Sequence, residues 1–163
     1  SRYGVKLEIS KERKRLGTAG PILLLKDVLT EPFLVMNGDV LTKCNYSKLY
    51  QFALNINANL IISVKEFITP FKFGNISSNG DYVTGIIEKP DLKTNILAGI
   101  YIMKKGIFDF IKDNQHYDMD NLINDMLAKN LNVAKYDLHE YWLDIGGVDE
   151  YKQAQTIYNE NFK

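Results

Sequence analysis

The chain has 163 residues, of which 45% are hydrophobic and 25% charged, as in one soluble globular domain with a sizeable core. Lys and Arg together number 20, as do Asp and Glu, so the formal net charge is zero. Because proteins that bind nucleic acid or anionic membranes usually carry a basic surplus, we expect neither as a partner.

The elements are predicted from hydrophobic periodicity and turn signals. Strands are expected over 5–9, 32–38, 59–67, 95–105, 132–138 and 140–145, and a hairpin over 71–90 with its turn at 77–80. Helices are expected over 21–29, 45–57 with Ser47 as N-cap, 106–113, 118–130 and 147–162. Strands that alternate with helices predict a single α/β domain, with a mostly parallel sheet and a small antiparallel insertion.

The single cysteine, Cys44, excludes an intrachain disulfide and favours a reduced, cytoplasmic setting. The chain begins with "SRYGVKLEIS", without Met, and enters a strand-like alternation almost at once. We therefore expect a fragment of a longer protein.

"FLVMNGDV", residues 33 to 40, allows two interpretations. Asn37-Gly38 after an apolar run is typical of a tight hairpin turn, but a hairpin needs a second strand, and residues 39–57 predict a loop and then a helix. A strand followed by a loop and a helix would place Asn37, Gly38 and Asp39 at the carboxyl end of a parallel strand, where α/β sheets bind ligands. We favour a site over a plain turn.

Two carboxylates end apolar runs in matching contexts, Asp39 in "VMNGD" and Asp144 in "YWLDIGG". Paired carboxylates suit Mg²⁺, which takes oxygen ligands and keeps several waters. The alternative is that both are ordinary turn or cap residues, and spacing alone does not bring them together.

The loop "LGTAGP", residues 16 to 21, has small residues directly before a predicted helix. Glycines allow a backbone to approach a base or a phosphate closely, although such a loop is more often only a connection. In "IIEKP", Glu88 could accept bonds from sugar hydroxyls and Lys89 could meet a phosphate. Strand alternation puts these two side chains on opposite faces, so only a bend near Pro90 would let both serve one site. The alternative is a solvated ion pair.

Gly74 and Gly99 lie inside predicted strands, which usually marks a bulge or a group packed close to the backbone. A sugar ring would fit that description, and so would a neighbouring side chain.

The motifs "LGTAGP", "VMNGDVL", "FGNI…VTGIIEKP", "LAGIYIM" and "YWLDIGGVDEY", in this order, resemble the sugar-phosphate nucleotidyltransferases, or nucleotide-sugar pyrophosphorylases, and most closely their mannose-1-phosphate guanylyltransferase branch. The resemblance runs from about residue 3 to residue 151. It implies a Rossmann-like three-layer α/β sandwich that joins a sugar 1-phosphate to a nucleoside triphosphate and releases pyrophosphate, with Mg²⁺ as the cofactor.

The resemblance also implies roles for single residues. Asp39 and Asp144 correspond to the metal-binding aspartates and, with Lys89, to the catalytic set. The implied nucleotide-binding residues are Leu16, Gly17, Thr18, Ala19, Asn37 and Gly38. The implied sugar-binding residues are Gly74, Glu88, Lys89, Ala98 and Gly99, with Lys89 on the sugar's phosphate.

One departure from the family pattern is large, because the N-terminal glycine-rich loop that grips the triphosphate has no counterpart in these 163 residues. We therefore expect a partial, N-terminally truncated nucleotidyltransferase domain over 1–163, with weak or absent activity on its own. An edge exposed by missing strands would be covered by a second copy of the chain, by strand swapping or by rearrangement, or else the fragment would be only marginally stable.

The leading hypothesis is guanylyl transfer to a hexose or heptose 1-phosphate, while transfer of the other nucleotides stays open. The alternative is a non-catalytic module that binds a nucleotide or a sugar nucleotide. A nucleic-acid-binding domain is disfavoured by the neutral charge.

Overall fold

The computed structural model describes residues 4–162 of the chain. Its helices are α1 (Tyr46–Asn55), α2 (Met119–Ala128) and α3 (Val148–Asn161), with two 3₁₀ turns, η1 (Gly20–Leu25) and η2 (Lys105–Asp109). Its strands are β1 (Phe33–Met36), β2 (Val40–Thr42), β3 (Leu60–Pro70), β4 (Asn75–Asn79), β5 (Tyr82–Ile87), β6 (Asp91–Met103), β7 (Val133–Asp137) and β8 (Trp142–Asp144). None of the helices in this part of the chain has the length and hydrophobicity of a membrane span.

The described chain divides into two compact units. The first comprises residues 4–37, 45–62 and 100–135, and the second comprises residues 38–44, 63–99 and 136–162. That residues 1–163 form one partial domain stays a prediction.

The largest sheet has the strand order β1-β6-β3-β7 and is mixed. β1 pairs antiparallel with β6, with Phe33 opposite Met103 and Met36 opposite Ile100. β3 and β7 run parallel, because the carbonyls of Asn132 and Val64 accept bonds from Asn59 and Leu138, so that residue numbers rise together on both strands. The α/β class predicted from the sequence is confirmed, but the bonded neighbour of β1 is antiparallel rather than parallel.

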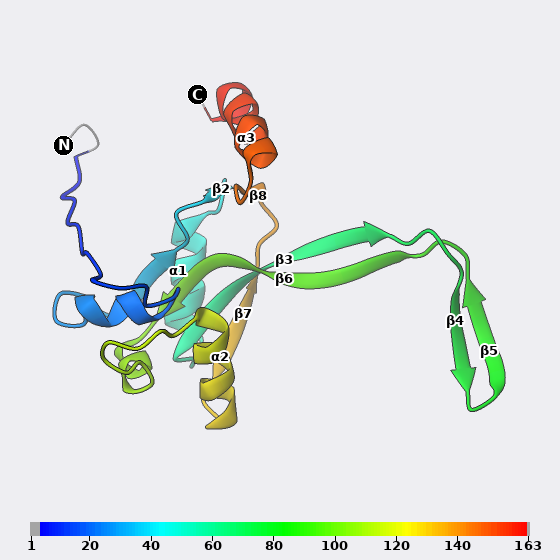
Figure 1. Ribbon diagram of the computed structural model, residues 1–163, viewed down its shortest axis with the longest axis horizontal. Coiled ribbons are helices and arrows are strands. Elements are labelled where there is room, and N and C mark those ends of the chain that lie inside the picture. Colours follow the sequence, from blue (N-terminus) through cyan, green and yellow to red (C-terminus); the bar gives the residue numbers. More distant parts are fainter. Residues whose placement is uncertain (1–3, 163) are drawn as a thin grey trace. The chain divides into compact units, whose positions relative to one another are not determined.

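The core of the first unit lies on both faces of β6. Tyr101 and Met103 join a buried cluster with Leu122 and Met126 of α2 and with residues of η1, β1, β3 and η2. Ile100 and Ile102 are fully buried on the opposite face, by strand alternation. α1, which buries Leu49 and Ala53, lies behind the sheet in Figure 1. Helices on both faces of the sheet agree with the predicted sandwich.

Both ends of α2 are tied down. At the C-terminal end the Leu131 N–H donates to the Met126 carbonyl at 3.0 Å and the Asn130 N–H to the Leu127 carbonyl at 2.9 Å. Asn130 has φ +55°, so these bonds form the αL closure that commonly ends a helix. At the N-terminal end, the Met119 N–H donates to the hydroxyl of Thr18 at 2.8 Å, which caps α2 from a distant loop.

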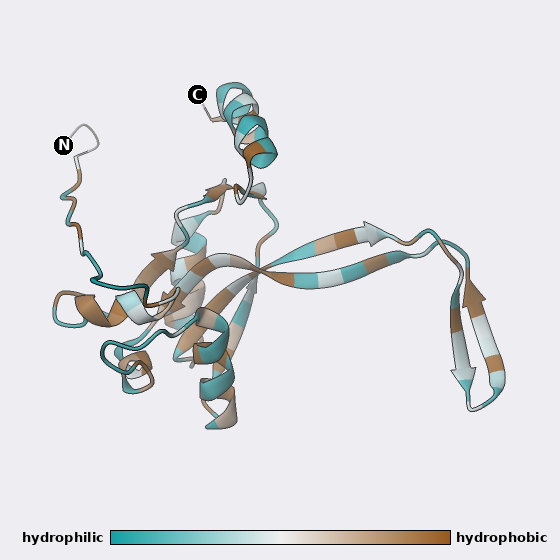
Figure 2. Ribbon diagram, viewed as in Figure 1, coloured by the Kyte–Doolittle hydropathy of each residue, from teal (hydrophilic) through white to brown (hydrophobic). Residues whose placement is uncertain are grey.

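The second unit contains the β4–β5 hairpin that the sequence predicted as an antiparallel insertion. The two strands pair from Asn75 opposite Ile87 to Asn79 opposite Tyr82, with a register shift between Ser77 and Ser78. The turn is therefore the two-residue Gly80-Asp81 rather than residues 77–80, and Gly80 takes the positive φ of +56° that such a turn requires. The exposed hydrophobic residues of the hairpin lie mainly on β5, namely Val83, Ile86 and Ile87, whereas β4 has only Ile76 and is otherwise polar (Figure 2).

Two strand predictions are wrong. Residues 5–9 form no strand, and Val5, Leu7 and Ile9 are 52%, 77% and 95% exposed. An alternating segment becomes a strand only when a ladder partner supplies its hydrogen bonds, and no described strand pairs with this segment. Conversely, a strand does follow Asn37-Gly38, since β2 occupies Val40–Thr42. It pairs with β8 and not with β1, so the hairpin interpretation still fails.

Three helix predictions also change. Residues 21–29 and 106–113 give short 3₁₀ turns instead of α-helices. The N-cap of α1 is Asn45, whose side-chain oxygen accepts from the Lys48 N–H at 3.0 Å, and not Ser47. Helix α1 therefore begins with Tyr46, which places Ser47 inside its first turn.

The N-cap assignment is testable. We expect Asn45→Ala to lower the free energy of unfolding by about 1 kcal/mol, because one N–H group of the first turn loses its acceptor. Ser47→Ala is the matched control and should change the stability by less than about 0.5 kcal/mol. Urea unfolding followed by circular dichroism measures both. A larger loss for the Ser47 variant would contradict the assignment.

Candidate functional site

The β2–β8 ribbon of the second unit carries both predicted metal ligands. Val40 stands opposite Asp144 in the antiparallel register, and the Ile145 N–H donates to the Asp39 carbonyl at 2.7 Å. Asp39 and Asp144 are therefore diagonal neighbours across the ribbon. Both are exposed. Strict alternation would separate their side chains, but Asp39 lies in the turn before β2, which frees its side chain from that rule.

The two carboxylates fit a hard cation that keeps water and phosphate ligands. The donor set is oxygen only, as Mg²⁺ prefers, and its exposure leaves room for further ligands. Among residues 4–162 no three His, Cys, Asp or Glu side chains form a group that could hold a metal. This part of the protein would thus supply a small share of the coordination shell, which is how Mg²⁺ is held when substrate phosphates complete it.

The ribbon is tied to the longer strands of the second unit. The Leu138 N–H donates to the Val64 carbonyl at 2.8 Å. The Lys65 ammonium donates to the carbonyls of His139 and Glu140, at 3.3 and 2.8 Å. These bonds fix the segment that leads into β8.

Cys44 closes the other end of the ribbon. Its N–H donates to the Thr42 hydroxyl at 3.0 Å, and that hydroxyl donates to the Tyr141 carbonyl at 2.8 Å. The residue is 7% exposed. Burial, and secondarily the negative charge of Glu140, raise the pKa of the Cys44 thiol from 9.0 to about 11. The thiol is therefore neutral at physiological pH, consistent with a structural residue.

Part of the predicted sugar-binding set meets at the base of the β4–β5 hairpin. A Cβ atom on Gly74 would lie 3.1 Å from Glu88 Oε2 and 3.3 Å from Ile86 Cδ1, so Gly74 lies against the Glu88 carboxylate. The chain bends at Glu88 and Lys89, and Lys89 has φ +47°, in the left-handed region that few non-glycine residues adopt. This is the bend that sequence alternation required if Glu88 and Lys89 were to serve one site.

Ala98 and Gly99 lie in the interior of β6 and are buried. Gly99 has φ +68°, which only glycine takes readily inside a strand. The carbonyl of Ala98 accepts a 2.8 Å hydrogen bond from the Trp142 indole N–H. The predicted sugar-lining backbone is thus bonded to β8, the strand that ends in Asp144.

The predicted nucleotide loop belongs to the first unit and encloses Tyr117. The Tyr117 carbonyl accepts the N–H groups of Ala19 and Gly20 at 3.0 and 2.9 Å, and the Tyr117 N–H donates to the Leu16 carbonyl at 2.8 Å. Gly17 has φ +81°, and a Cβ there would lie 2.5 Å from Asp118 Oδ1. The glycine is therefore required by close packing of the loop against residues 117–118.

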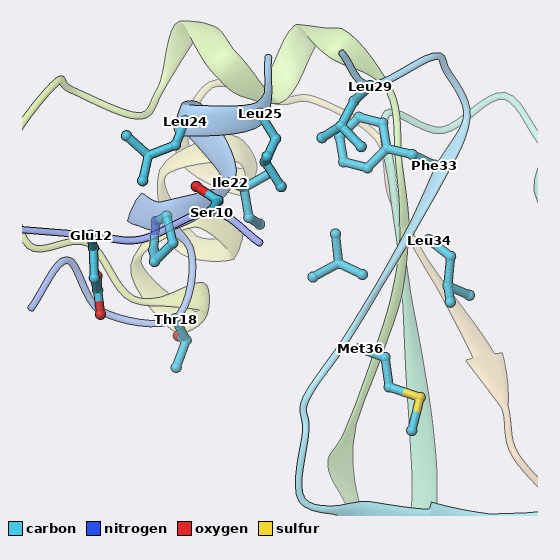
Figure 3. Close-up of a pocket in the computed structure, with 12 residues that line it drawn as sticks. Ser10, Glu12, Thr18, Ile22, Leu24, Leu25, Leu29, Phe33, Leu34 and Met36 are labelled. Carbon is cyan, nitrogen blue, oxygen red and sulfur yellow. The ribbon is translucent and has the colours of Figure 1, made fainter. Parts of the chain in front are cut away.

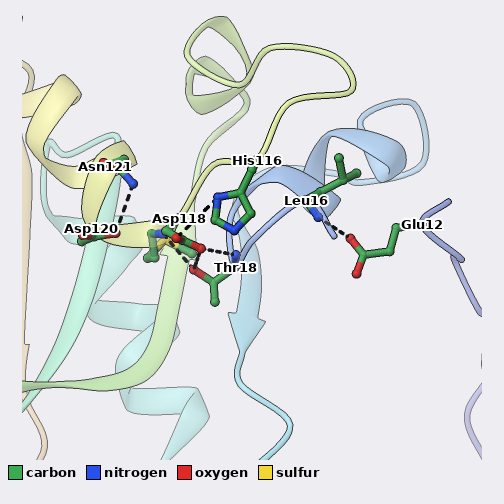
Figure 4. A network of polar contacts seen from close by, with 8 residues as sticks. Glu12, Leu16, Thr18, His116, Asp118, Asp120 and Asn121 are labelled. Atoms are coloured by element: carbon green, nitrogen blue, oxygen red, sulfur yellow. Dashed lines mark hydrogen bonds and ion pairs between the residues drawn. The ribbon is translucent and has the colours of Figure 1, made fainter. Parts of the chain in front are cut away.

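Thr18 takes part in the same network (Figure 4). Its N–H donates to Asp118 Oδ1 at 3.0 Å, and its hydroxyl accepts the Met119 N–H at 2.8 Å. His116 Nδ1 lies 3.6 Å from Asp118 Oδ2. Thr18 is thus engaged in capping α2, so the loop has a structural role whether or not it also contacts a nucleotide.

A pocket of about 500 Å³ lies between this loop and β1 (Figure 3). Its wall includes the polar residues Ser10, Glu12 and Thr18, and is otherwise aliphatic or aromatic. Leu34 and Met36, from the edge strand β1, are 42% and 36% exposed. This lining is typical of an uncovered sheet edge rather than of a site for phosphates.

Sequence reasoning missed two residues that organise the predicted site. Asp118 holds Thr18 across 100 positions of sequence, a contact for which no local pattern exists. Trp142 lies two residues before Asp144 in a motif already noted, and a lone tryptophan beside a candidate ligand was the available signal.

The set of predicted residues divides between the two units. Leu16 to Ala19 and Asn37 belong to the first unit. The second unit holds the other predicted site residues, which are Gly38, Asp39, Gly74, Glu88, Lys89, Ala98, Gly99 and Asp144. Within the second unit the structure brings together Asp39 with Asp144, Gly74 with Glu88, and Ala98 with β8.

Comparison with known proteins identifies the family. Residues 1–161 match the family model described as nucleotidyl transferase. The chain belongs to the nucleotidyl transferase family. It is 30% identical over 164 residues to the mannose-1-phosphate guanyltransferase of Yarrowia lipolytica, an alignment that covers 96% of this chain and 45% of that protein. The chain spans about half the length of the curated relatives it matches.

Solved structures of similar proteins agree with the fold. HddC from Yersinia pseudotuberculosis has a TM-score of 0.63 at 27% identity, over 93% of this chain and 65% of that one, and a second HddC structure is complexed with GMP-PN. A putative glucose-1-phosphate thymidylyltransferase from Bacillus anthracis has a TM-score of 0.71 at 18% identity, covering 95% of this chain and 66% of that one. The Rossmann-like class expected from the sequence is therefore confirmed.

Gly17→Ala tests the packing of the nucleotide loop. We expect it to lower the free energy of unfolding by about 2 kcal/mol or more, because the backbone is left-handed and the added methyl meets Asp118 and Tyr117. Gly85→Ala in β5, where a Cβ would meet nothing within 4 Å, is the matched control and should unfold near the wild-type midpoint. Equal denaturation midpoints for all three proteins would contradict the packing argument.

The raised thiol pKa predicts how the ribbon responds to pH. Between the unfolded pKa of 9.0 and the folded pKa of about 11, the unfolded chain loses the thiol proton and the folded chain keeps it. The Cys44 contribution to stability is therefore complete below pH 9 and is lost as the pH rises through this window. Between pH 9 and pH 11, the free energy of unfolding measured in urea should fall more steeply with pH for the wild type than for Cys44→Ala, which lacks the titrating thiol.

The same shift should protect the thiol from alkylation. At pH 8 the folded protein should react with iodoacetamide about a hundredfold more slowly than the urea-unfolded chain, as judged by mass spectrometry. Rapid labelling of the folded protein would contradict the burial of Cys44.

Proposed function

We propose that the protein of which these 163 residues form at least part transfers a nucleotidyl group from a nucleoside triphosphate, GTP, to a sugar 1-phosphate, with release of pyrophosphate. The observation that supports this most is that Asp39 and Asp144 lie on one two-stranded ribbon, diagonal to each other. Family membership supplies the reaction class.

In this reaction an oxygen of the sugar phosphate attacks the α-phosphorus of the triphosphate in line. A new P–O bond forms as the bond from the α-phosphorus to the bridging oxygen breaks, and pyrophosphate leaves with the electron pair of that bond. Mg²⁺, when bound by Asp39 and Asp144, supplies positive charge against the charge that develops on the phosphates. The protein's part is positioning and electrostatics, since little covalent chemistry is left for side chains.

Different residues of the chain would bind different groups of the sugar phosphate. Glu88, next to Gly74, would accept bonds from sugar hydroxyls, and Lys89 would donate to the phosphate of the sugar. The left-handed backbone at Lys89 supports a role, because strain of this kind clusters at functional positions. Ala98 and Gly99 would offer a backbone wall to the sugar ring.

The nucleotide would contact the residues of the first loop and the turn before β2, namely Leu16, Gly17, Thr18, Ala19, Asn37 and Gly38. Two similar proteins support the identity of the nucleotide base and of the sugar. HddC was solved with GMP-PN, and the Yarrowia lipolytica relative is named for mannose 1-phosphate and guanylyl transfer. We therefore propose guanine as the base and a mannose-like hexose 1-phosphate as the acceptor. A non-catalytic binding module is not favoured, because the Yarrowia lipolytica relative is named as a transferase.

Three further expectations stay predictions. Little or no turnover by these 163 residues alone follows from the sequence analysis, so the test below uses binding. A cytoplasmic location is supported by the single, reduced cysteine. Coverage of the outer edge of β1 by a second copy is supported by the partly exposed Leu34 and Met36.

Mn²⁺ in place of Mg²⁺ tests the metal site through electron paramagnetic resonance. With GDP-mannose present, Asp39→Asn and Asp144→Asn should each weaken Mn²⁺ binding roughly tenfold, because one anionic ligand becomes neutral while the exposed side chain keeps its shape. Asp81→Asn, in the distant hairpin turn of the same unit, is the matched control and should bind as the wild type does. Wild-type affinity in the double variant Asp39→Asn/Asp144→Asn would reject the site.

A further inference from the structure

Trp142 is the chain's one tryptophan and lies partly buried at the start of β8. Its indole N–H donates to the Ala98 carbonyl at 2.8 Å, and its backbone stands opposite Thr42 of β2. A single side chain thus connects the β2–β8 ribbon to β6. The partner carbonyl belongs to a residue with no exposed surface, so the bond is shielded from competing water on that side.

The bond acts on a peptide group at which β6 departs from regular strand geometry. The Ala98 carbonyl belongs to the peptide unit that ends at the Gly99 nitrogen, and the φ of Gly99, +68°, is the rotation next to this unit. Without a side chain, Gly99 resists rotation about φ only weakly. The indole N–H supplies a fixed donor, so it selects the orientation of the peptide plane between Ala98 and Gly99.

Trp142 belongs to the same strand, β8, as the proposed metal ligand Asp144. Asp144 is two residues beyond Trp142 in β8, so their side chains leave the ribbon on the same face. Strand β8 would therefore carry a metal ligand at its last residue and the donor to the Ala98 carbonyl at its first.

We propose that Trp142 is a positioning residue that holds the Ala98–Gly99 backbone in the orientation that receives the sugar, in register with Asp144. The inference rests on the proposed function, because it takes Ala98–Gly99 as the sugar wall and Asp144 as a metal ligand. Trp142 acts through the Ala98 carbonyl, and removal of its N–H should weaken sugar phosphate binding while metal binding is kept.

The single indole gives a direct spectroscopic test in the unaltered chain. In ¹⁵N-labelled protein the indole N–H is one cross-peak, and we expect its hydrogen exchange to be at least about tenfold slower than in the urea-unfolded chain. Addition of mannose 1-phosphate with Mg²⁺ should shift the peak and slow its exchange further. Gly99→Ala, which disfavours the positive φ, should move the same peak without ligand.

Trp142→Phe keeps an aromatic ring and removes the N–H. Calorimetry should show that the dissociation constant of mannose 1-phosphate rises about tenfold, whereas that of Mn²⁺ stays within about twofold. Tyr141→Phe, which also removes one polar group from an aromatic residue of this segment, is the control and should leave both constants unchanged. A merely structural role would weaken both ligands together.

Failure of this proposal differs from failure of the proposed function. If the wild type binds mannose 1-phosphate and Trp142→Phe binds it equally well, the positioning role is wrong and the proposed function stands. If the wild type binds Mn²⁺ but no mannose 1-phosphate, the proposed assignment of the sugar site is wrong, and the positioning role of Trp142 is rejected as well. If Trp142→Phe fails to fold, the wild type alone still tests the proposal. Fast hydrogen exchange of its indole N–H, with no change in the cross-peak on addition of mannose 1-phosphate, would overturn it.

Discussion

The backbone pairing of β2 with β8 is the constraint on which the candidate metal site depends. The bond from the Ile145 N–H to the Asp39 carbonyl, together with the register that sets Val40 opposite Asp144, brings two carboxylates from distant parts of the sequence to one short ribbon. A three-residue ribbon is marginal by itself, so its position depends on the bonds that tie its flanks to β3 and β6. The positions of the two carboxylates are therefore fixed by main-chain hydrogen bonds and not by the packing of their own side chains.

Three residues of the predicted site, Gly17, Lys89 and Gly99, have a positive φ. At Gly17 the left-handed turn lets the loop close over Tyr117 and Asp118, and at Gly99 it turns a peptide plane inside β6. Lys89 takes such an angle with a full side chain, which costs free energy of order 1 kcal/mol or more. The angle of Gly17 is explained by the close approach of Tyr117 and Asp118. Lys89 lies in the bend beside Glu88, among the residues predicted to bind the sugar phosphate, and this makes it a candidate for function.

The sequence predicted what depends on local pattern. Alternating and apolar runs located β1, β3, the hairpin and β6, and helical periodicity located α1, α2 and α3. It failed where a partner far along the chain decides the outcome. Residues 5–9 have the alternation of a strand but are not part of any strand in the described chain, whereas Val40–Thr42 have little pattern and become a strand because β8 pairs with them. The contact of Thr18 with Asp118 is invisible to any local signal for the same reason.

The predicted site residues of the first unit and those of the second differ in the structural roles that they already have. In the first unit the hydroxyl of Thr18 caps α2 and Gly17 is enclosed by residues 117–118, so folding alone accounts for both residue types. In the second unit Asp39, Asp144 and Glu88 are exposed carboxylates whose charge serves no evident packing role. Carboxylate oxygens are the ligands that a hard cation prefers, and their exposure leaves room for water or phosphate as further ligands. The second unit thus carries the stronger argument for chemistry, and the loop of the first unit carries the stronger argument for structure.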